Sequence, residues 1–228
     1  MSFQKTRKCP EGYPAPQVPE NEKEKKVYLR KATAEAKEAA APLLRELADI
    51  GVNVESIWDL VNYNFDYRQA VPILIDWLPR MQNIRVREAI VRALTVKFAS
   101  PAAIYPLLIE FECGSEFIKW EVGNALAEVA DKSVFDDILR LVKEPQHGTA
   151  RQELIISLGR LKDKRAIPTL VNLLRDPDVQ GHAINALRLL SATEARSAIE
   201  PFLAHEKAWI RREAKSALGK FDKLGKDS

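Results

Sequence analysis

A repeated eight-residue pattern constrains the fold of this chain more than any other feature. Five of its six copies carry proline at the third place, and all six carry leucine at the fifth. The leucines follow one another at intervals of 30, 34, 31, 31 and 33 residues; they are Leu44, Leu74, Leu108, Leu139, Leu170 and Leu203. A period of this length is the signature of stacked supersecondary units. The sequence therefore predicts a repeat protein.

The prolines of this pattern indicate where helices begin. Proline breaks a helix interior but is tolerated in the first turn, where its missing N–H has no intrahelical partner. One helix is therefore expected to start beside each of Pro42, Pro72, Pro106, Pro168 and Pro201. Trp77 holds the eighth place of its copy, which is apolar in four of the other copies, and is expected in the core.

A second helical series lies between these segments. It aligns on Leu94, Leu126, Leu158, Leu187 and Leu218, and positions −8 and −4 before each leucine are apolar. Position −1 is always alanine or serine. Residues at this spacing share one face of a helix, and a small residue beside the stripe permits close approach of a neighbouring helix. The two series together predict six helical hairpins.

Composition agrees with an all-α fold, because Ala, Leu, Glu, Lys and Arg dominate and glycine occurs only nine times. Residues 1–20, with Pro10, Pro14, Pro16 and Pro19, are expected to form an extended arm, and 21–41 an exposed lead-in helix. The repeat domain is expected over 42–221, followed by a disordered tail at 222–228. The net charge of +3 lies in the first 41 residues, since residues 42–228 contain 26 basic and 26 acidic side chains.

The repeat resembles the short HEAT-like repeat of phycobilisome lyases. The resemblance is clearest in LGRLKDKRAIPTLVNLLRDPDV from Leu158 and in VREAIVRAL from Val86. It implies an all-α, right-handed α-α superhelix, a HEAT-like solenoid whose second helices line a concave face that commonly grips a protein or peptide. It implies no single activity.

Two sets of residues on the second helices are candidates for a site. A basic ladder at position −7 comprises Arg87, Lys119, Arg151 and Arg211. It either braces adjacent repeats through carbonyls and loop acids such as Asp176, or lines a positive groove; the acids interleaved with it favour bracing. Trp120 stands at position −6, where its counterparts are polar or glycine. It either indicates a contact surface or folds sideways over the loop at 113–115. The proposed concave partner-binding set is Glu88, Arg92, Trp120, Asn124, Gln152 and Asn185.

No catalytic constellation, cofactor site or metal site is expected. Cys9 and Cys113 lack zinc-ligand spacing, and no phosphate-binding loop or nucleophile motif occurs. The resemblance to deoxyhypusine hydroxylase, a HEAT-like enzyme with repeated His-Glu pairs, extends here to one pair, His205 and Glu206. His147, alone in a loop, is expected to be solvated.

Three functions are compatible with the sequence. The leading hypothesis is a cytoplasmic, non-catalytic scaffold, adaptor or assembly factor that binds another protein or peptide, with no membrane segment and no small-molecule ligand. The second is an accessory subunit of a bilin lyase-like or other enzyme complex. The third, not favoured, is nucleic-acid binding through the basic arm, which carries Lys5, Arg7, Lys8, Lys23, Lys25 and Lys26. A C-terminal basic cluster would aid it, comprising Arg211, Arg212, Lys215 and Lys220.

Overall fold

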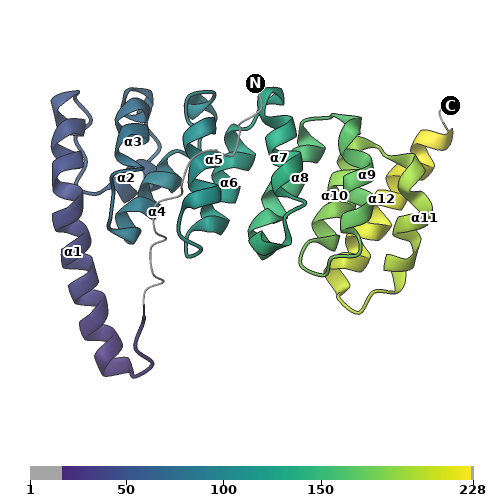
Figure 1. Ribbon diagram of the computed structural model, residues 1–228, viewed down its shortest axis with the longest axis horizontal. Helices are drawn as coiled ribbons and strands as arrows, with labels where there is room; N and C mark the ends of the chain where they lie inside the picture. The colour runs from purple at the N-terminus through teal and green to yellow at the C-terminus, as the bar shows by residue number, and fades with distance from the viewer. Residues whose placement is uncertain (1–16, 227–228) are drawn as a thin grey trace. The chain divides into compact units, whose positions relative to one another are not determined.

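The computed structural model describes residues 17–226, and these residues form twelve α-helices and no strand (Figure 1). They divide into two compact units, which meet in the sequence between Val129 and Ala130. Most of the expected arm, 1–20, lies outside the described residues, and its last four residues are not helical.

The N-terminal unit contains three pairs of helices. They are α1 (Glu22–Asp49) with α2 (Ile57–Asn62), α3 (Val71–Trp77) with α4 (Ile84–Ala93), and α5 (Ile104–Cys113) with α6 (Lys119–Val129). The second helices pack in succession, since α4 contacts both α2 and α6. Figure 1 shows the first half of α1 extending past the end of α3.

The C-terminal unit repeats this arrangement. Its helices are α7 (Phe135–Leu141), α8 (Gln152–Arg160), α9 (Ile167–Leu173), α10 (Gln180–Leu190), α11 (Arg196–Ile199) and α12 (Ala208–Lys226). Here α10 packs between α8 and α12. Short 3₁₀ turns precede most first helices. One of them, Lys164–Ala166, is capped by Asp163, whose side chain accepts a hydrogen bond from the Arg165 N–H.

The six pairs confirm an all-α solenoid of helical hairpins. Every residue predicted at positions −8, −4, −1 and 0 of the second helices is buried. The polar member of position −1, Ser157, satisfies its hydroxyl by donating to the Leu154 carbonyl at 2.7 Å. Burial of this one stripe on each second helix supplies the core that holds neighbouring pairs together.

The expected helix start at Pro42 is wrong. Pro42 lies inside α1, so the lead-in segment and the first helix of the first pair form one continuous helix. The Ala, Glu and Lys residues before Pro42 favour helix, and the burial of Leu43 and Leu47 holds the segment after it. Loss of one backbone hydrogen bond does not outweigh these two effects. Pro72, Pro106 and Pro168 lie in the first turn of an α-helix, as predicted, whereas Pro201 lies in a 3₁₀ turn after α11.

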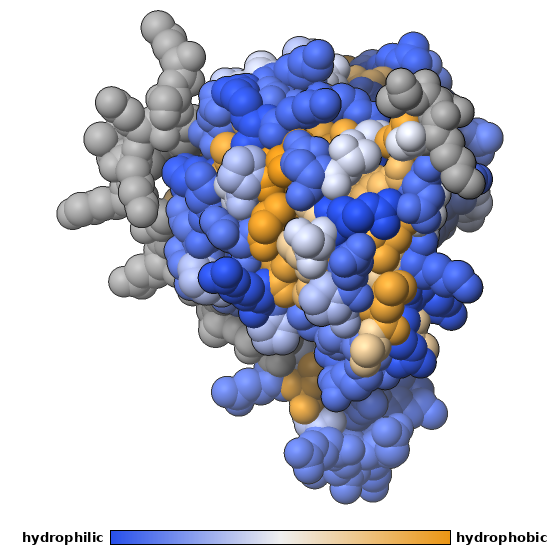
Figure 2. Space-filling view, turned by 90° about the vertical axis from the view of Figure 1, so that its right-hand side faces the viewer, coloured by the Kyte–Doolittle hydropathy of each residue, from blue (hydrophilic) through white to orange (hydrophobic). Residues whose placement is uncertain are grey.

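The predicted disordered tail at 222–228 is wrong for its described part, because α12 continues to Lys226. Phe221, at the expected domain boundary, is buried, and the helix extends one turn beyond it. Figure 2 views the end of the C-terminal unit and shows apolar strips between hydrophilic side chains. Leu203 and Leu224 are among the exposed apolar residues of this unit.

Two places of the first-helix pattern also differ from expectation. Leu203, the sixth aligned leucine, is exposed, because its segment is a 3₁₀ turn rather than an α-helix. Trp77 is only partly buried: its Nε1–H donates to Glu46 at 2.8 Å, and the Arg80 guanidinium lies 4.6 Å from its ring centroid. The adjacent Leu78 takes the core place. Among the described helices, none is both long and apolar enough to cross a bilayer.

Candidate functional site

The basic ladder lies mostly inside the protein. The Arg87 guanidinium binds both carboxylate oxygens of Glu110, and it donates a further bond to the Met81 carbonyl at 2.8 Å. Lys119 is buried as well, with an ion pair to Glu116 and its ammonium 5.9 Å from the Phe111 ring centroid. In the N-terminal unit, Arg87 thus joins α4 to α5, and Lys119 joins α6 to the loop and helix before it.

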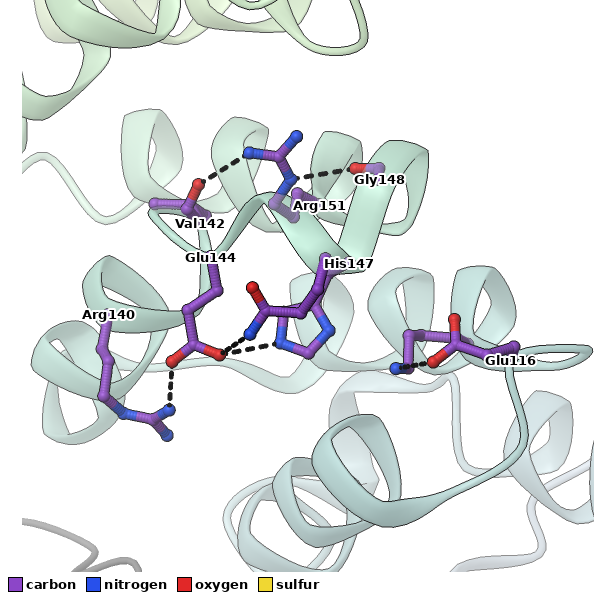
Figure 3. Close-up of polar contacts among 9 residues, drawn as sticks. Glu116, Arg140, Val142, Glu144, His147, Gly148 and Arg151 are labelled. Atoms are coloured by element: carbon purple, nitrogen blue, oxygen red, sulfur yellow. Dashed lines mark hydrogen bonds and ion pairs between the residues drawn. The ribbon is translucent and has the colours of Figure 1, made fainter. Parts of the chain in front are cut away.

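Arg151 has the same role in the C-terminal unit. It donates to the carbonyls of Gly148 and Val142, as Figure 3 shows, and its third bond, 2.8 Å long, reaches Asp176. Arg211 is exposed, yet it also donates to backbone carbonyls, those of His205 and Glu206. Arg87 and Arg151 therefore brace successive helix pairs, whereas the contacts of Arg211 lie within its own pair. The three buried members of the ladder cannot line an open positive groove.

The face opposite the core stripe is called here the second-helix face; it is formed by positions −6, −5, −2 and +2 of the second helices. In the N-terminal unit, Arg92 organises this face. Its Nε donates to Glu88 at 2.9 Å and its Nη2 to Glu121 at 3.1 Å. Its guanidinium also lies 5.7 Å from the ring centroid of Trp58 on α2. One arginine thus connects α2, α4 and α6.

Trp120 lies in the first turn of α6, and 46% of its surface is exposed. It is adjacent in sequence to Glu121, the acceptor of Arg92 on the same helix. Asn124, one turn further along α6, is partly buried. Trp120 is thus an exposed indole on the same helix as the Arg92 acceptor, Glu121.

A cavity of about 430 Å³ adjoins the same face between α1, α2 and α4. Its wall is mixed in character, with the Trp58 ring, apolar side chains and charges of both signs. The lining residues that belong to the network are Trp58 and Glu88. Two of the side chains that line the cavity are therefore also contacts of Arg92.

The remaining two candidates, Gln152 and Asn185, belong to the C-terminal unit. Gln152 donates to the Asp178 carbonyl at 2.8 Å and so braces two repeats. Asn185 donates to Glu213 at 3.0 Å and accepts from Arg188 at 3.3 Å. Asn185 also lines a hollow of about 490 Å³ on the second-helix face of α8, α10 and α12.

Sequence reasoning missed the residues that shape this hollow. Trp209 is partly exposed and lies beside Gly181, where a Cβ would approach its ring to 2.1 Å. Its ring also packs against His182, with centroids 5.5 Å apart. The one signal in the sequence was Gly181, which stands at the position occupied by Trp120 in α6.

His182 is held in an unusual environment. Its Nδ1 is buried and has no hydrogen-bond partner among the described residues. Burial lowers the pKa of His182 below its ordinary 6.5, while the carboxylates of Glu153 and Glu213 act in the opposite direction. The neutral imidazole is thus favoured, with an acid on each neighbouring helix.

The other histidines have structural partners. His147, expected to be solvated, is buried instead, and its Nε2 lies 3.1 Å from the Glu144 carboxylate (Figure 3). His147 lies in the 3₁₀ helix Pro145–Arg151 rather than in an open loop. His205 contacts Gln180 at 3.0 Å and stacks on Phe202. No group of three metal-ligating side chains occurs in the described part of the chain.

Comparison with known proteins agrees with the fold. A family model described as HEAT repeats matches residues 108–181. A bilin biosynthesis protein, PecE, of Nostoc sp. (strain PCC 7120 / SAG 25.82 / UTEX 2576) is 44% identical over 57 residues. That stretch is 24% of this chain and 22% of PecE. Together with the six helix pairs, these matches show that the chain is a HEAT-like repeat protein.

Proposed function

We propose that this protein is a non-catalytic scaffold that holds a protein or peptide segment against the second-helix face of its N-terminal unit. The observation that carries the proposal is Trp120, an exposed indole on a helix whose neighbouring surface is fixed by Arg92. Partner binding would bury this ring. HEAT-like repeats present such faces as extended contact surfaces. A cytoplasmic location is part of the same proposal.

Several contacts indicate that this surface is organised before a partner arrives. Arg92 is fixed by two carboxylates and one ring, so few of its rotamers remain to be lost on binding. A preformed surface with one protruding aromatic side chain matches the usual anatomy of an interface hot spot. Catalysis would need convergent acid, base or nucleophilic groups, and this surface offers an arginine already paired with two glutamates.

The test uses the full chain as bait in native lysate, with quantitative mass spectrometry of the captured proteins. Trp120→Ala is expected to reduce recovery of a stoichiometric partner by about tenfold or more, since hot-spot truncation costs ~2 kcal/mol or more. The melting temperature should stay within a few degrees of the parent's, because the ring is exposed. Tyr63→Ala, at an aromatic residue 65% exposed in the loop after α2, is the control. Equal recovery in both variants would contradict the proposal.

A second function is favoured by the match to PecE. We propose as the alternative that the chain is an accessory subunit of a bilin lyase-like or other enzyme complex, acting with a partner that completes the site. The identity of 44% over 57 residues supports it. Bilin attachment in a co-expression assay that requires this chain would favour the alternative. Stable capture without any attachment would favour the scaffold.

Nucleic-acid binding through the basic arm remains the third and least favoured function. Lys5, Arg7 and Lys8 lie outside the described residues. Lys23, Lys25 and Lys26 lie near the start of α1, where Lys25 already pairs with Glu22. Retention on DNA that depends on salt and is lost on deletion of residues 1–26 would support this function.

A further inference from the structure

The second-helix face of the C-terminal unit carries its charges in two separate rows. Glu153 and Glu213 stand at position −5 of their helices, on either side of His182. Four basic residues gather near the other end, and they are called here the cation cluster: Arg160, Lys162, Arg188 and Lys220. Positions −5 and +2 are seven residues apart, or about 10 Å along a helix. The hollow of about 490 Å³ connects the two rows, since Glu153, Glu213, Arg160 and Arg188 all line it.

Two members of the cation cluster bind the end of α10. The Lys162 ammonium donates to the Leu189 carbonyl at 2.5 Å, and that of Lys220 donates to the Arg188 carbonyl at 2.8 Å. Lys162 also has a backbone φ of 60°, in the left-handed region that favours glycine. Carbonyls at a helix C-terminus attract cations, and this accounts for two ammonium groups. It does not account for the two guanidinium groups beside them.

The charges of the cation cluster are not balanced by any acid in the part of the chain that the structure describes. Among the described residues, none of the four side chains forms an ion pair with a carboxylate, and the Arg188 Nε has no hydrogen-bond partner. Burial lowers the pKa of the Lys220 ammonium, and the positive charges of Lys162 and Arg188 lower it further. The cations therefore repel one another in the free protein.

The N-terminal unit contains a balanced version of the same contact. Lys97, in the 3₁₀ turn after α4, donates to the Glu128 carbonyl and forms an ion pair with the Glu128 carboxylate at 3.6 Å. Glu128 stands at position +2 of α6. The equivalent position on α8, α10 and α12 is held by Arg160, Leu189 and Lys220. The acid that completes this contact in one unit is thus missing from the other.

We propose that the cation cluster binds a carboxylate of an acidic segment in a protein partner, with Arg160 and Arg188 as its main ligands. This site rests on the proposed scaffold function and names the chemistry of what it holds. Guanidinium groups bind carboxylates through paired, charge-assisted hydrogen bonds. The apolar wall of the hollow, formed by Ile156, Leu189 and Trp209, suits neighbouring side chains of a polypeptide.

The test is a binding titration of the full chain with fluorescein-labelled poly-L-glutamate at low salt, followed by fluorescence anisotropy. The parent chain is expected to bind, and the double variant R160Q/R188Q to bind at least about tenfold more weakly. Leu189→Glu supplies the missing acid at position +2 and is expected to weaken binding to a similar extent. This variant keeps all four cations, and its melting temperature is measured beside that of the parent to show that it folds. Lys97→Gln is the matched control and should bind as the parent does.

Three results would overturn the site. The first is no binding of poly-L-glutamate by the parent chain, and the second is equal binding by the parent, R160Q/R188Q and Leu189→Glu. The third is tighter binding of a single-stranded oligonucleotide that is lost in the same variants, which would assign the cluster to nucleic acid. Capture that depends on Trp120 reports separately on the scaffold function. If that capture persists while poly-L-glutamate fails to bind, this site is wrong and the scaffold function stands.

Discussion

The guanidinium of Arg87 holds both carboxylate oxygens of Glu110, with Nε 2.8 Å from Oε1 and Nη2 2.5 Å from Oε2. Each side chain is 4% exposed. The pair joins α4 to α5, and hence one helix pair to the next. Its burial means that either charge, if left alone, would remain in a poorly solvated position.

Arg87→Gln is therefore expected to lower the free energy of unfolding by about 3–5 kcal/mol, as is usual when one partner of a buried ion pair is removed. Urea denaturation followed by circular dichroism measures the change. Lys31→Gln removes an exposed ion pair with Glu35 on α1 and should cost less than about 1 kcal/mol. Equal costs for the two variants would show that the buried pair has no special structural role.

Gly159→Ala is expected to disturb the packing of α8 against α10. A Cβ at this position would lie 2.9 Å from the Ala186 Cα and 3.0 Å from its carbonyl oxygen, and backbone atoms cannot move aside as a flexible side chain can. Overpacking of this kind costs about 1–3 kcal/mol. The control is Gly219→Ala on α12, where no atom lies within 4 Å and alanine should stabilise the helix by about 0.5–1 kcal/mol. Thermal melts should shift in opposite directions.

Gly181→Ala is expected to displace the Trp209 ring rather than the helices. The closest atom to the added Cβ is the ring's Cη2 at 2.1 Å, at the far end of a side chain that can rotate outward. Tryptophan fluorescence should shift to longer wavelength as the indole enters water. The same substitution in a Trp209→Phe background should leave the emission unchanged, and a shift there would show that another tryptophan responds.

Stability should fall as the pH drops through the ordinary pKa of histidine, near 6.5. Burial lowers the pKa of His182 in the folded state, so the unfolded chain binds more protons in this window. The free energy of unfolding therefore decreases from pH 7.5 toward pH 5.5. His182→Gln should flatten this part of the curve, measured by urea denaturation at a series of pH values. An unchanged slope in the variant would mean that other groups cause the dependence.

Much of the candidate site depends on details that the sequence pattern could not supply. The basic ladder could be recognised in the sequence as a row of basic residues. The acids interleaved with it favoured the prediction that it braces the repeats. The hollow around Trp209 could not be predicted, because Trp209 lies outside the aligned stripe. Its contact with Gly181 joins two different helices, α12 and α10. The pairing of Arg92 with Glu121 joins residues 29 apart in the same way.

The periodic leucines, prolines and small residues determined the solenoid, because each second helix must bury the same stripe against its neighbours. Local composition determined the helices but not all their ends: Pro42 lies within α1, and Leu78 replaced Trp77 in the core. Only the tertiary structure decided which charges are neutralised. Lys97 meets Glu128, whereas Lys162 meets a carbonyl among other cations, and such pairings depend on the distances between side chains of different repeats.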